Sequence, residues 1–128
     1  MTTASLDSIL LASTDPQRLH DWYAAALEPQ EDTEMDRYRV LRFGNVYLLI
    51  DTRGDIGGRN PEPGRMILNF DVPDARAVAA RMTELGTTWH ADLEERDGSL
   101  FATAIDPDGN YVQIIQLSEE ARAQMGDQ

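Results

Sequence analysis

The feature that most constrains the fold is a plan of secondary structure that occurs twice along the chain. Asp15 followed by Pro16 is typical of a helix N-cap and first helical residue, and Asp74 holds the same place in the second half. When the two aspartates are overlaid, the apolar stripes of the two predicted helices coincide. The overlaid pairs are Leu19 with Val78, Tyr23 with Met82 and Ala26 with Leu85. A repeated supersecondary unit is therefore predicted.

β-rich segments flank both predicted helices. Strands are predicted over 6–13, 38–43, 46–50, 65–72, 87–95, 100–105 and 111–117. Residues 30–36 are predicted as a polar, acidic loop and 52–64 as a longer connecting loop. The sequence therefore predicts an α+β fold of two βαβββ modules, about residues 5–55 and 64–117, forming a concave mixed sheet with helices on the outer face.

Composition limits the class of protein. The 128 residues fit a single domain, predicted over 1–128. The chain has no cysteine, which excludes disulfides and thiolate metal ligands. Its formal net charge of −12 opposes binding to nucleic acid and favours cationic ligands. The N-terminal residues are typical neither of a signal peptide nor of a membrane span, so a cytoplasmic protein with no membrane partner is predicted.

One segment carries a family resemblance. Residues 106–116, Asp-Pro-Asp-Gly-Asn-Tyr-Val-Gln-Ile-Ile-Gln, closely resemble the C-terminal signature of the vicinal oxygen chelate superfamily. That superfamily includes glyoxalase I, extradiol dioxygenases, fosfomycin resistance enzymes and bleomycin resistance proteins. Residues 14–23 are similar to its first helix, and 70–74 to its central junction between strand and helix. The resemblance spans roughly residues 5–117 and implies one glyoxalase/bleomycin-resistance-like domain.

The resemblance also implies where metal ligands would stand. Metal-dependent members take one ligand from each of four strands, and these positions fall on Ser8, Leu49, Ile67 and Gln113. Leucine and isoleucine have no donor atoms, a neutral serine is a poor ligand, and one amide oxygen cannot hold a divalent cation alone. No metal and no other cofactor are therefore predicted.

Strand alternation from these positions gives a predicted ligand-binding face. Its mainly apolar lining, with a few polar groups, suits a small organic ligand. The predicted ligand contacts are Tyr38, Tyr47, Asn69, Asp71, Trp89, Tyr111 and Gln113. Trp89 is included because an indole stacks on planar or cationic groups, with packing under the second helix as the alternative. A register slip of one residue would turn every strand side chain to the opposite face.

His90 is the candidate catalytic residue. Asp92 and Glu94 follow it at alternate positions of a predicted strand, and a histidine beside carboxylates can act as a general base near neutral pH. The alternative is a histidine at a strand edge with solvated neighbours.

Two main functional hypotheses follow from the resemblance. The first is a homodimeric, metal-independent protein of the bleomycin resistance type, which sequesters a cationic or aromatic natural product and so confers antibiotic resistance. The second is an enzyme of the same superfamily, a lyase, isomerase or dioxygenase-related protein acting on a small organic substrate. A module that binds a protein partner is the third alternative.

Overall fold

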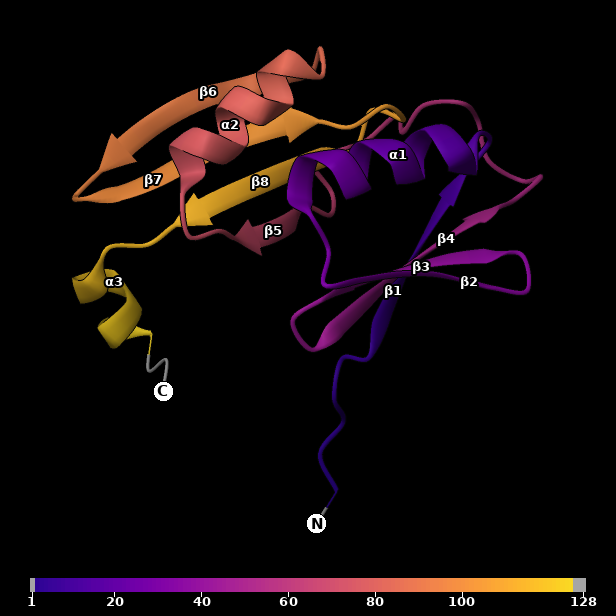
Figure 1. Ribbon diagram of the computed structural model, residues 1–128, viewed down its shortest axis with the longest axis horizontal. Coiled ribbons are helices and arrows are strands. Elements are labelled where there is room, and N and C mark those ends of the chain that lie inside the picture. Colours follow the sequence, from indigo (N-terminus) through magenta and orange to yellow (C-terminus); the bar gives the residue numbers. More distant parts are fainter. Residues whose placement is uncertain (1, 126–128) are drawn as a thin grey trace. The chain divides into compact units, whose positions relative to one another are not determined.

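The computed structural model describes residues 2–125 and has eight strands and three helices within them (Figure 1). The chain divides into two compact units, one ending at Gly58 and one beginning at Arg59. In each unit the order is strand, helix and three further strands, and the four strands form one mixed sheet. The predicted α+β class with two βαβββ modules is confirmed. Of the predicted domain 1–128, residue 1 and residues 126–128 lie outside the described part.

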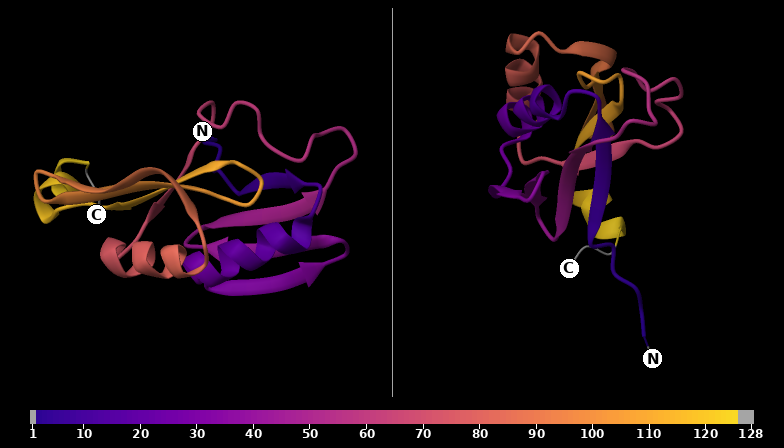
Figure 2. Two further views of the ribbon diagram at one scale, coloured as in Figure 1. Left: turned by 90° about the horizontal axis from the view of Figure 1, so that it is seen from above. Right: turned by 90° about the vertical axis from the view of Figure 1, so that its right-hand side faces the viewer.

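The first unit is a four-stranded sheet with one helix. Its elements are β1 (Ser8–Ser13), α1 (Pro16–Leu27), β2 (Glu31–Met35), β3 (Tyr38–Phe43) and β4 (Val46–Thr52). The strand order is β1-β4-β3-β2, with β1 parallel to β4 and the other pairs antiparallel. The left view of Figure 2 shows α1 lying across this sheet.

Local chemistry fixes the ends of α1. The Asp15 side chain accepts a hydrogen bond from the backbone N–H of Arg18, and Pro16 follows as the first helical residue. The helix ends at Glu28, whose φ of 48° is left-handed. The buried face of α1 comprises Leu19, His20, Trp22, Tyr23 and Ala26.

The prediction of a loop over residues 30–36 is wrong, because Glu31–Met35 forms strand β2. It pairs antiparallel with β3, and all five of its side chains are exposed. An edge strand can be held by backbone hydrogen bonds alone, and charged side chains protect such edges from aggregation. The hydrophobic alternation that identifies a half-buried strand is therefore absent here.

The second unit repeats the plan. Its elements are β5 (Leu68–Asp71), α2 (Ala75–Glu84), β6 (Thr88–Arg96), β7 (Ser99–Ile105), β8 (Tyr111–Gln116) and α3 (Glu119–Gln124). The strand order is β5-β8-β7-β6, with β5 parallel to β8. The strand predicted over 65–72 is shorter in the structure. It pairs only with β8, and in this parallel register Arg65 and Met66 lie opposite the turn residues Gly109 and Asn110, before β8 begins at Tyr111. Within residues 2–125, no helix is long and apolar enough to cross a membrane.

The segment 106–110 is a tightly bonded turn between β7 and β8. Asp106 is only 2% exposed. Its Oδ1 accepts hydrogen bonds from the backbone N–H groups of Asp108 and Asn110, and its Oδ2 accepts one from the Asn110 side chain. Gly109 has a φ of +85°, and a Cβ there would lie 3.0 Å from the Arg59 guanidinium. This segment of the family signature therefore builds a turn.

We predict that Asp106→Ala lowers the free energy of unfolding by about 3 kcal/mol, because it leaves buried N–H groups without their charged acceptor. Chemical denaturation would measure the change. Asp97→Asn is the matched control: it removes one negative charge from an exposed turn, and asparagine tolerates the positive φ there. The control should cost less than about 0.5 kcal/mol. Equal losses in the two variants would contradict the assigned role.

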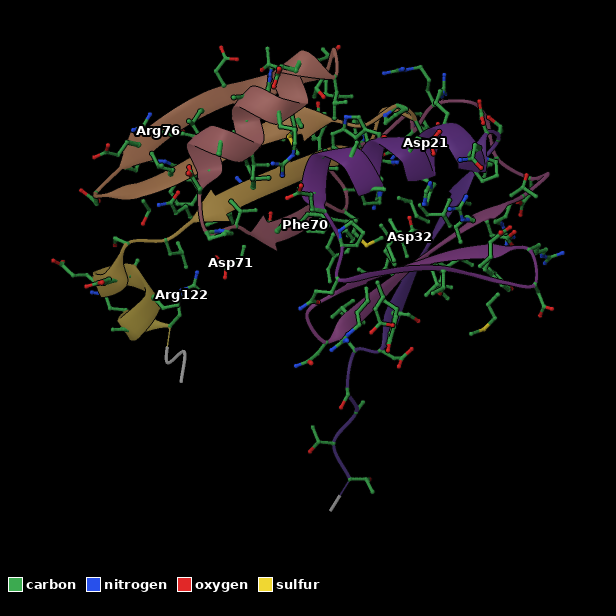
Figure 3. All side chains as sticks on the ribbon, in the orientation of Figure 1. Asp21, Asp32, Phe70, Asp71, Arg76 and Arg122 are labelled. Carbon is green, nitrogen blue, oxygen red and sulfur yellow. The ribbon has the colours of Figure 1, made fainter. Side chains whose placement is uncertain are left out.

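A polar cluster joins α1 to its sheet. His20 is buried, with Nε2 lying 2.8 Å from Asp32 Oδ2 and 2.8 Å from Arg39 Nη2. Its Nδ1 lies 3.0 Å from Asp21 Oδ1. Figure 3 labels Asp21 on α1 and Asp32 on β2. The hydrogen bond with His20 is the main cause that holds the pKa of Asp21 below its ordinary value.

A lowered folded-state pKa means that the ionised Asp21 favours the folded state above its ordinary pKa. This contribution is lost as the pH falls below about 4, through the folded-state pKa. We therefore expect the stability difference between the wild type and Asp21→Asn to shrink between pH 6 and pH 2.5 in denaturation experiments. Asp92→Asn removes the same charge from another exposed position and should show no such shrinkage. A difference that does not change with pH would contradict the expectation.

Candidate ligand-binding faces

Contacts with α2 identify the two faces of the second sheet. The Gln116 side-chain oxygen accepts a hydrogen bond from the Ala75 backbone N–H, and Trp89 Nε1 donates to Thr83 Oγ1, at 2.7 and 3.2 Å. Gln116 and Trp89 therefore lie on the face that α2 covers. Because side chains alternate along a strand, Tyr111, Gln113 and Ile115 lie on the opposite face. We call this side of the second sheet, which α2 does not cover, the second open face.

The register shows which side chains are neighbours on the second open face. Asn69, Gln113 and Thr103 form one row across β5, β8 and β7. Asp71, Ile115 and Phe101 form the next row, and Tyr111 pairs with Ile105. The face thus combines amides, a hydroxyl, a carboxylate and aromatic rings. Four of the predicted ligand contacts come together on it, namely Asn69, Asp71, Tyr111 and Gln113.

Trp89 does not belong to this group. Its indole lies on the α2 face, half-buried and hydrogen-bonded to Thr83, and its partner on β7 is the fully buried Ala104. This position matches the alternative that was open from the sequence, packing under the second helix. The role of Trp89 as a ligand contact remains a prediction, but it cannot share a site with Gln113 on one face of the sheet.

His90 lies beside Tyr111. The pairing of β6 with β7 is irregular between Trp89 and Ala91, and the His90 ring stacks on the Tyr111 ring with centroids 4.3 Å apart and planes 23° apart. His90 is exposed. The carboxylates that follow it in the sequence do not orient it: within residues 2–125 it makes no hydrogen bond or ion pair with Asp92 or Glu94. Stacking on Tyr111 fixes the imidazole instead.

A pocket of about 330 Å³ lies at one end of the second sheet. Its lining comprises Asp71, Val72, Pro73, Gln116, Leu117 and Arg122. Arg122 Nη2 on α3 donates to Asp71 Oδ1 at 2.5 Å, and Figure 3 shows the two side chains pointing toward one another. The sequence pattern around Arg122 does not predict this contact, because Asp71 is distant in the chain and a short C-terminal helix carries no local signal for it.

The first sheet also has a face turned away from its helix. Asp32 and Arg39 contact His20 on α1, so the alternate residues of β3, Tyr38, Val40 and Arg42, lie on the other side. We call this side the first open face. On β4, Leu48 and Ile50 are buried beneath α1, so Tyr47, Leu49 and Asp51 occupy the first open face. The predicted contacts Tyr38 and Tyr47 therefore share one face.

The four positions that the resemblance assigned to metal ligands lie in different surroundings. Ser8 pairs with Tyr47, and Leu49 lies on the same first open face. Gln113 lies on the second open face, and Ile67 precedes β5. Across residues 2–125, no group of three or more histidine, aspartate or glutamate side chains could hold a metal ion. The absence of a metal remains a prediction.

A protein-family model for a glyoxalase-like domain matches residues 8–115. This match covers most of the chain, which therefore belongs to the glyoxalase-like family within the vicinal oxygen chelate superfamily. No curated protein matches the chain.

Solved structures of low sequence identity have the same fold. The fosfomycin resistance protein FosX from Mesorhizobium loti is 14% identical with a TM-score of 0.71, covering 96% of this chain and 99% of its own. A glyoxalase/bleomycin resistance protein from Albidiferax ferrireducens is 17% identical with a TM-score of 0.71, covering 88% and 98%. A protein described as oxidase ChaP-H2 is 21% identical with a TM-score of 0.73, covering 91% and 96%. At these identities the likeness shows the fold alone.

Proposed function

We propose that this protein is a metal-independent binding protein of the glyoxalase/bleomycin resistance superfamily, which sequesters a cationic or aromatic natural product. The observation that carries the proposal is the aromatic surface made by His90 and Tyr111, with Gln113 and Asn69 on the same open face. Stacked rings offer a flat surface to a planar ligand, and the amides provide oriented hydrogen bonds.

Electrostatics and the residues at the mapped ligand positions also support this proposal. A formal net charge of −12 raises the local concentration of cationic compounds. Leu49 and Ile67 have no atoms that coordinate a metal, which supports metal independence. Bleomycin and fosfomycin resistance appear in the descriptions of two proteins with this fold, and we extend antibiotic resistance to this chain as a proposal.

We further propose that the protein is a cytoplasmic homodimer. Each four-stranded sheet has two edge strands, and an edge with free backbone hydrogen-bonding groups can pair with a second copy. This is the partner that we expect besides the small organic ligand.

Berberine, a planar aromatic cation, is a suitable first probe. We expect it to raise the Tm and to bind with micromolar affinity in calorimetry. Tyr111→Ala and Gln113→Ala should each weaken binding about 3- to 10-fold, by removing a stacking surface or an oriented amide. Trp89→Phe is the matched control for the second open face, because it keeps an aromatic ring on the opposite face and should leave the affinity for a compound bound beside Tyr111 and Gln113 unchanged. Failure of berberine to bind, or equal effects of all three variants, would contradict the proposal.

The exposed, stacked His90 favours an enzyme as the second candidate function, a lyase, isomerase or dioxygenase-related protein. Mass spectrometry of a bound compound after prolonged incubation separates the two functions. The binding proposal expects the compound to be recovered unchanged. A new product whose formation falls at least about 100-fold in His90→Ala would instead identify His90 as a general base.

A further inference from the structure

Asp51 is a buried carboxylate with only one of its oxygens engaged. The residue is 4% exposed, and its Oδ2 lies 3.3 Å from Arg37 Nε. Its Oδ1 is buried and has no hydrogen-bond partner in the described part of the chain. Burying an oxygen of an ionised carboxylate without a donor is costly, so such an atom calls for an explanation. A ligand that supplies the missing donor would provide one.

A second arginine–aspartate pair, Arg53 with Asp55, shows which hydrogen bonds Asp51 lacks. Arg53 donates to both oxygens of Asp55, from Nε to Oδ1 at 2.9 Å and from Nη2 to Oδ2 at 2.7 Å. Those hydrogen bonds hold the pKa of Asp55 below its ordinary value. That pair is exposed and fully matched, whereas Asp51 is buried and receives a single long contact. The Asp51 carboxylate can therefore still accept a fork of two N–H groups.

Arg37 is well placed to be displaced from Asp51. Its side chain is 72% exposed, and it follows Asp36 in the turn between β2 and β3. Because Arg37 is exposed, it regains its hydration when it moves away, and the incoming cation takes over the pairing with the buried Asp51. Its guanidinium carbon lies 5.7 Å from the centroid of the Tyr38 ring, so the same cation also touches an aromatic face.

The carboxylate lies on the first open face. Asp51 pairs with Ala12 on β1 and alternates with Leu49 and Tyr47 along β4. Tyr38 lies beside it on β3, because the following residue, Arg39, pairs with Ile50. A carboxylate next to a tyrosine ring, with apolar neighbours, is a suitable environment for a planar cation.

We infer that Asp51 and Tyr38 form a subsite for an amidinium or guanidinium group, and that Arg37 is an internal cation which the ligand displaces. The amidinium or guanidinium group of the ligand donates one N–H to each oxygen of Asp51, so Oδ1 gains the hydrogen-bond donor that it lacks. The planar cation takes the place of the Arg37 guanidinium near Tyr38. This inference rests on the proposed function in that it assumes a chain that binds small molecules, and it assigns the chemistry of the first open face.

Benzamidine and its neutral isostere benzamide test the inference, with affinity measured by titration in NMR spectra. The wild type should bind benzamidine at least 10-fold more tightly than benzamide. Asp51→Asn should abolish that preference, and Arg37→Ala should strengthen benzamidine binding about 3- to 10-fold, because it removes the competing cation. The two variants thus have opposite expected effects.

Arg53→Ala and Asp55→Asn are the matched controls. They remove the same charges from an exposed pair in the same unit, and they report any effect of net charge alone. Arg37→Ala tests the exchange even where Asp51→Asn reduces folding, because Arg37 is exposed. Weaker benzamidine binding in Arg37→Ala, equal binding of benzamide, or changes matched by the controls would overturn the inference.

The berberine measurements separate this inference from the proposed function. Berberine binding that depends on Tyr111 and Gln113, combined with benzamidine binding that ignores Asp51, would overturn the inference and leave the proposed function standing. Absence of binding by both probes would overturn both.

Discussion

The hydrophobic core and the candidate ligand faces both depend on one constraint: a single helix can cover only one face of a four-stranded sheet. In the first unit, the apolar stripe of α1 covers Leu48 and Ile50 while the alternate residues of β4 face the other way. In the second unit, α2 covers Val112 and Ile114. Burial of these side chains stabilises each unit, and strand alternation then leaves a second set of side chains available for binding. The core and the candidate ligand faces are thus two results of one constraint.

The parts of the fold that sequence reasoning predicted are those with a local cause. Asp15 and Asp74 each cap a helix through a side chain that accepts a hydrogen bond from the backbone N–H three residues later. The faces of β4 and β8 followed from alternation. The exposed strand β2 has no apolar pattern, so only pairing with β3 reveals it. The contacts of Trp89 with Thr83 and of Arg122 with Asp71 depend on packing, which residue patterns do not encode.

Each of the two candidate ligand faces has side chains that suit ligand recognition better than catalysis. The His90 imidazole stacks on the Tyr111 ring. Among the described residues, it lacks the carboxylate partner that commonly orients a histidine acting as a general base. Asn69 and Gln113 offer both donors and acceptors, so they can match several polar groups. The Asp51 carboxylate, by contrast, accepts hydrogen bonds but donates none, so it adds selectivity for cationic groups. The two open faces therefore differ in how strictly each defines its ligand.

The turn at residues 106–110 explains why membership of this family is easy to recognise and function is not. Its aspartate, glycine and asparagine are required by the bonding of Asp106 and the positive φ of Gly109, whatever compound the protein meets. A binding protein and an enzyme built on this scaffold need the same turn to join the same two strands. Proteins that share this segment are therefore alike in how the chain reverses direction between two strands. Their chemistry depends instead on the side chains of the open faces.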